Sequence, residues 1–60
     1  MSNFEFAGQE YTIGEINGIE CVWGTEAGQG NAEVLSDIGS WWAGDADQIE
    51  AFVAAAEACK

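Results

Sequence analysis

Carboxylates are the main chemically active groups of this chain. Its 60 residues include 11 Asp and Glu, one Lys and no His, which gives a formal net charge of −10. Without His there is no imidazole base, and without Arg no guanidinium to clamp a phosphate or an oxyanion. We therefore expect no enzyme, with no catalytic residues, no cofactor and no metal site. The expected chemistry is charge-driven binding.

The negative charge restricts the kinds of partner. Direct binding of nucleic acid requires cations that neutralise phosphates, and an anionic membrane surface repels an acidic protein. A basic partner is expected instead. The N-terminal residues show no pattern of a secretory signal, and the apolar run 51–56 is too short to cross a membrane. We accordingly expect a cytoplasmic protein, monomeric because of its self-repulsion.

Two cysteines, Cys21 and Cys59, leave two readings open. A reducing cytoplasm favours two buried thiols, whereas a small core can gain stability from a disulfide. Two thiols and scattered carboxylates do not make a convincing metal site.

A β-hairpin is the strongest local prediction. Asn17-Gly18 stands between apolar residues and is typical of a two-residue type I′ turn, which predicts strands 10–16 and 19–23. The two-residue loop places Glu15 directly opposite Glu20. Residues 3–7 alternate in the same way and are a candidate third strand.

Two helices are predicted after the hairpin. Apolar residues recur at helical spacing over about 31–43, with Asn31 as N-cap, and again over about 46–58, where Asp45 and Gln48 resemble a capping box. The expected fold is therefore α+β, a small antiparallel sheet packed with two helices. Residues 1–60 are expected to form a single domain.

The hairpin has two dissimilar faces. We expect one face to form the core side, with Thr12, Ile16, Ile19, Cys21 and Trp23. The opposite face carries the two hairpin carboxylates together with Tyr11, Ile13 and Val22.

Seven carboxylates are the predicted partner-binding residues. They lie at the hairpin tip, on the first predicted helix at positions i and i+4, and on the outer side of the second. At these places like charges stand close together with no basic neighbour in the sequence, so they cost stability. A small domain with such repulsion suggests a function for the field itself. These residues are Glu15, Glu20, Glu33, Asp37, Asp47, Glu50 and Glu57.

In size, charge and lack of catalytic groups the whole chain resembles small acidic phage-encoded inhibitors, in particular anti-CRISPR proteins of type I systems. Several of these are DNA mimics that occupy the DNA path of the Cascade complex. The resemblance implies an inhibitor that blocks a basic nucleic-acid-binding surface, such as that of a Cascade subunit, in the host cytoplasm. No functional residue is transferred by motif.

A different class of function is the alternative. Trp41 and Trp42, or the apolar residues Tyr11, Ile13 and Val22, are candidates for a protein-binding surface of a non-catalytic adaptor or structural module. The acidity would then serve only solubility.

Overall fold

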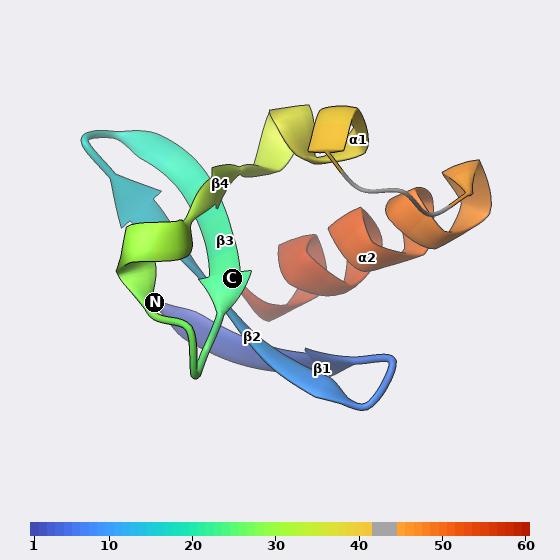
Figure 1. The fold of residues 1–60 in the computed structure, drawn as a ribbon, viewed down its shortest axis with the longest axis horizontal. Helices are drawn as coiled ribbons and strands as arrows, with labels where there is room; N and C mark the ends of the chain where they lie inside the picture. Colours follow the sequence, from blue (N-terminus) through green and yellow to red (C-terminus); the bar gives the residue numbers. More distant parts are fainter. Residues whose placement is uncertain (42–44) are drawn as a thin grey trace.

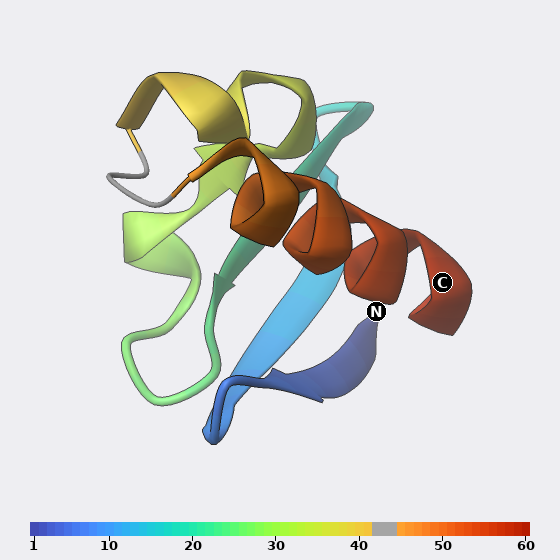
Figure 2. The ribbon, with the colours of Figure 1, turned by 90° about the vertical axis from the view of Figure 1, so that its right-hand side faces the viewer.

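The computed structural model describes residues 1–41 and 45–60. Four antiparallel strands form one sheet in the order β1-β2-β3-β4, namely Ser2–Phe6, Gln9–Ile16, Ile19–Gly24 and Glu33–Val34. Helix α2 (Ala46–Cys59) crosses one face of this sheet, as Figures 1 and 2 show. The connection from β3 to α2 contains two 3₁₀ turns, η1 (Gln29–Asn31) and η2 (Leu35–Asp37), and the short α1 (Ile38–Trp41).

The hairpin prediction is confirmed. Asn17 and Gly18 have φ angles of 54° and 79°, as a type I′ turn requires, and Glu15 is the Cα partner of Glu20. The candidate third strand is also present as β1. Its turn into β2 repeats the geometry, because Ala7 and Gly8 have φ angles of 54° and 81°.

The turn at Ala7 predicts a stabilising substitution. An alanine in the left-handed region places Cβ close to its carbonyl oxygen, at a cost of roughly 1–2 kcal/mol. Asparagine tolerates this backbone conformation better. Ala7→Asn should raise the free energy of unfolding by about 0.5–1 kcal/mol and the melting temperature by about 4 °C. Thermal denaturation followed by circular dichroism measures this change. The inverse swap Asn17→Ala in the other turn should destabilise by a similar amount, and a neutral result for both variants would contradict the argument.

The second predicted helix is confirmed, and its N-cap with it. The backbone N–H of Gln48 donates to Oδ1 of Asp45 at 2.8 Å, which satisfies one of the free N–H groups of the first turn. Phe52 and Ala56 are buried, and Ile49, Val53 and Cys59 pack beside them.

The first predicted helix, 31–43, is wrong, and so is the fold class with two packed helices. Residues 33–34 pair with β3 instead, through Cys21↔Val34 and Val22↔Glu33. Gly39 weakens a helix over these residues by about 1 kcal/mol, while pairing supplies partners to the open edge of β3. Leu35 and Ile38 still reach the core, from η2 and α1. Asn31 caps no helix; its amide donates to the carbonyl of Ala27.

The predicted core face of the hairpin is also wrong. The main core lies on the opposite face, where Ile13 and Val22 are each 2 % exposed. The reason is β1, whose register adds Phe4 and Phe6 beside Tyr11 on that face, and this makes it the more apolar one. Ile19, expected to be buried, is 51 % exposed.

The face turned away from α2 forms a smaller buried layer. Thr12, Cys21 and Trp23 lie there and are each less than 10 % exposed. The Thr12 hydroxyl donates to Oδ1 of Asn3 at 3.0 Å and shares a 2.8 Å hydrogen bond with the hydroxyl of Thr25. Both faces of this thin sheet are thus partly covered.

The apolar hairpin residues proposed for a protein-binding surface are not available for one. Ile13 and Val22 are covered by α2, and Tyr11 is half-buried with its ring 4.9 Å from that of Phe52. Trp42 and the side chain of Trp41 lie outside the described residues.

Candidate functional site

The carboxylates cover the surface of the protein. Ten of the eleven belong to exposed residues, and Glu20 is half-buried. On α2 the apolar residues take up the core side and leave the carboxylates outward, and in the sheet Glu5 and Glu10 alternate with core residues. Glu15 and Glu20 instead share the core face of the hairpin with Ile13 and Val22 and lie next to its turn. The result is a surface of almost uniform sign.

Three of the predicted partner-binding residues meet at one end of the molecule. Glu15 and Glu20 are cross-strand neighbours, and Glu57 of α2 is joined to Glu20 through a shared cation. Nζ of Lys60 lies 2.8 Å from Oε2 of Glu20 and 2.9 Å from Oε2 of Glu57. We call these four residues the Lys60 cluster. The formal charge of the cluster is −2, so the single lysine relieves the local repulsion only in part. The expectation that these carboxylates have no basic neighbour is wrong for Glu20 and Glu57.

The cluster changes the acidity of its members. The hydrogen bond from Lys60 holds the pKa of the Glu57 carboxyl below its ordinary value of 4.5. Hydrogen bonds to Glu20 and Glu57 raise the pKa of the Lys60 ammonium above its ordinary value of 10.5. Both shifts favour the charged forms, as expected for an ion pair.

The ion pairs predict a pH window. A lowered carboxyl pKa contributes stability above the unfolded value of 4.5 that is lost as the pH falls through the folded value. A raised ammonium pKa contributes stability below the unfolded value of 10.5 that is lost as the pH rises. The difference in melting temperature between the native chain and Lys60→Met should therefore be largest between these values and shrink below pH 4.5. It should be small throughout, because these side chains are exposed.

NMR titration of the Glu57 side-chain carbonyl carbon tests the same pair directly. The midpoint should lie below 4.5 in the native chain, stay low in Lys60→Arg and return toward 4.5 in Lys60→Met. An unchanged midpoint in Lys60→Met would show that Lys60 does not hold Glu57.

The remaining predicted residues lie apart from this cluster. Asp47 and Glu50 are exposed on the first half of α2. Asp47 lies about 15 Å from Glu57 along the helix axis. Glu33 lies in β4 and Asp37 in η2, so they do not form the predicted i, i+4 pair of a helix.

A second acidic group was not predicted. The register of β1 with β2 places Glu5 directly opposite Glu10, and Glu26 lines the same hollow as Glu10 near the β1–β2 turn. Reading Ala7-Gly8 as a two-residue turn would have revealed the first pair from the sequence, because the turn sets the register. The approach of Glu26 depends on the loop after β3.

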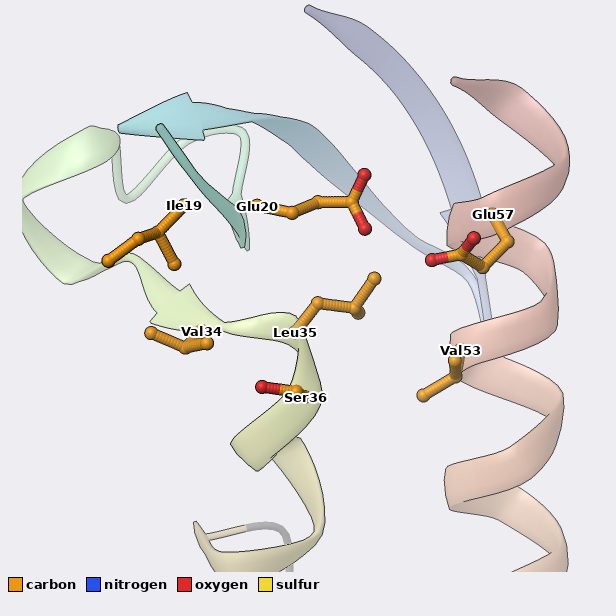
Figure 3. A pocket seen from close by; sticks show the side chains of 7 residues that line it. All are labelled: Ile19, Glu20, Val34, Leu35, Ser36, Val53 and Glu57. Atoms are coloured by element: carbon orange, nitrogen blue, oxygen red, sulfur yellow. The ribbon is translucent and has the colours of Figure 1, made fainter. Parts of the chain in front are cut away.

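A shallow apolar groove opens beside the Lys60 cluster. Its volume is about 220 Å³, and its lining includes the apolar side chains of Ile19, Val34, Leu35 and Val53. Figure 3 shows the carboxylates of Glu20 and Glu57 directed toward one another from the hairpin and from α2, above Leu35 and Val53.

Other kinds of site have little support in the described residues. Within residues 1–41 and 45–60 no three His, Cys, Asp or Glu side chains are arranged to hold a metal ion. Cys21 and Cys59 are free thiols that donate to the backbone carbonyls of Ile19 and Ala56, so the disulfide alternative is wrong. None of the helices in this part of the chain has the length and apolar character to cross a membrane.

The fold and surface define the chain as a small acidic sheet protein, with four antiparallel strands covered on one face by one long helix among the described residues. No family model, curated protein or solved structure matches it.

Proposed function

We propose that the protein is an acidic inhibitor that occupies the nucleic-acid-binding groove of a basic protein and so acts as a DNA mimic. The observation that carries this proposal is the exposure of ten of eleven carboxylates in a chain with a single Lys and no Arg or His. Solubility needs a net charge of only about 2–8 in a small domain, with both signs mixed. A function for the field explains a charge beyond that need.

The dimensions of the molecule suit such a role. Its longest axis is 28 Å, a length over which duplex DNA carries about 16 phosphate charges, at one per roughly 1.7 Å. The net charge of −10 is thus more than half that of the DNA it would replace.

The mechanism is steric and electrostatic. Carboxylates pair with the Lys and Arg side chains that otherwise hold phosphates, and the folded domain fills the groove. Association should be fast and sensitive to salt. The protein performs no catalysis in this proposal, binds no nucleic acid itself, and acts as a monomer in the cytoplasm, that of the host cell if it is phage-encoded. The resemblance to anti-CRISPR proteins makes Cascade the first partner to test.

Charge reversal tests the proposal. The partner is captured from host lysate in low salt, or purified Cascade is used, and displacement of a labelled DNA duplex is measured. The double variants Glu15→Lys/Glu20→Lys and Asp47→Lys/Glu50→Lys each change the net charge by four and should weaken competition by about tenfold or more, as expected for several lost charge pairs. Circular dichroism establishes that each variant is folded.

The matched control keeps the charge. Glu15→Asp/Glu20→Asp changes the same positions without altering the field and should compete within about threefold of the native chain. Competition that survives both reversals, or that is equally strong in high salt, would overturn the acidic mechanism.

A further inference from the structure

Ile19 is an unusual residue to leave on the surface of so small a protein. It is 51 % exposed, and among the described residues only Met1 is a more exposed large hydrophobic side chain. Ile19 does not stand alone, because Val34, Leu35 and Val53 line the same groove from β4, η2 and α2. Four elements thus contribute one apolar surface that opens to solvent (Figure 3).

The size of the groove restricts its occupant. Its volume of about 220 Å³ is below the roughly 300–1,000 Å³ of pockets for drug-sized ligands and cofactors. A cavity of about 150 Å³ accepts a benzene ring, so this groove accepts one large apolar side chain. A side chain of a protein partner fits better than a free small molecule.

The charged rim of the groove further restricts the kind of partner side chain that can bind. Glu20 and Glu57 both line it, and Nζ of Lys60 lies within 3 Å of one oxygen of each. Lys60 therefore stands where a cation of a partner would bind. Its side chain is 46 % exposed, so it can be displaced into water. An Arg guanidinium, with donors in a rigid fork, can pair with a carboxylate through two hydrogen bonds, which an ammonium cannot do.

We propose that this groove binds a basic segment of the protein partner, with one large apolar side chain in the groove and a neighbouring arginine on Glu20 and Glu57 in place of Lys60. The inference rests on the proposed function in taking the partner to be basic. It adds an anchor of defined position to what would otherwise be diffuse attraction. The apolar side chain supplies affinity that salt does not screen.

A peptide titration of the intact protein tests the groove. The probes are the capped tripeptides Leu-Arg-Arg and Ala-Arg-Arg, and the readout is the methyl NMR shifts of Ile19, Leu35 and Val53. Leu-Arg-Arg should move these methyl signals and bind about tenfold more tightly than Ala-Arg-Arg. The Leu side chain has three more carbons than that of Ala, and burial of about two of them accounts for this difference. Ile19→Ser should remove this preference, and the exposure of Ile19 makes that variant tolerable to the fold.

Three further variants separate the rim from the general field. Glu57→Gln should weaken Leu-Arg-Arg by about threefold, whereas Glu26→Gln, with the same change of charge near the β1–β2 turn, should have little effect. Lys60→Gln should strengthen binding, because it removes the competing ammonium. Equal effects of Glu57→Gln and Glu26→Gln, or shifts spread evenly over the surface, would overturn the groove proposal.

The two proposals fail in different ways. If the charge reversals abolish DNA competition while neither peptide binds the groove, the inhibitor function stands and the anchor is wrong. If the groove binds Leu-Arg-Arg while the charge reversals leave DNA competition unchanged, the groove stands as a peptide site and the proposal of a DNA mimic is wrong.

Discussion

Phe52→Ala should leave most of the protein molecules unfolded. The Phe52 side chain is 1 % exposed, and its ring makes edge-on contacts with Phe4, Phe6 and Tyr11 at centroid distances of 4.9–5.3 Å. These contacts hold α2 against β1 and β2. Truncation of a buried Phe to Ala costs about 3–5 kcal/mol. A domain of this length has a total stability of roughly 3–9 kcal/mol, so the loss is comparable with the whole.

Urea denaturation followed by circular dichroism measures this effect. Phe52→Leu keeps much of the apolar volume and should lose less stability than Phe52→Ala. Ala51→Ser, at an exposed position of the same helix, should change stability by less than about 1 kcal/mol. A Phe52→Ala variant with nearly native stability would show that α2 does not pack on the sheet through this residue.

Gly14→Val should loosen the other face of the sheet. A methyl group on Gly14 would lie 3.1 Å from Cη2 of Trp23 and 2.9 Å from Cγ of Met1. Met1 is 93 % exposed and can move, but the Trp23 ring is 7 % exposed and cannot shift freely. Trp23 thus packs diagonally across the strand on a position that has no side chain. Overpacking of this kind costs about 1–3 kcal/mol, more than the gain of up to about 1 kcal/mol in strand propensity.

The indole N–H signal of Trp23 in NMR spectra reports this change, with Trp23→Phe to assign the signal. In Gly14→Val the signal should shift and the melting temperature should fall by about 4–8 °C for each kcal/mol lost. Gly39→Ala is the comparison, because its added methyl group would meet Ile49 at an ordinary 3.9 Å and should be neutral or stabilising. A native melting temperature in Gly14→Val would contradict close packing of Trp23 on the strand.

The candidate site was predictable where it depends on local rules. The Asn17-Gly18 turn determines that Glu15 faces Glu20, and the helical spacing of α2 places Asp47, Glu50 and Glu57 outward. The contact of Lys60 with Glu20 was not predictable, because the two residues are 40 positions apart and meet only when α2 crosses the sheet. Glu33 and Asp37 were misplaced because a helical pattern of apolar residues competed with strand pairing.

The elements whose stability is local follow from the sequence alone. The hairpin register follows from a two-residue turn that needs positive φ, the start of α2 from a capping aspartate, and the acidic surface from composition. Which face of the sheet forms the core depends instead on the tertiary arrangement, because it is set by where β1 adds Phe4 and Phe6. Long-range packing likewise made residues 33–34 a strand and left Ile19 beside a groove between four elements. In a chain this small, the burial of the two aromatic rings of β1 on one face outweighs the apolar pattern that the hairpin alone shows on its two faces.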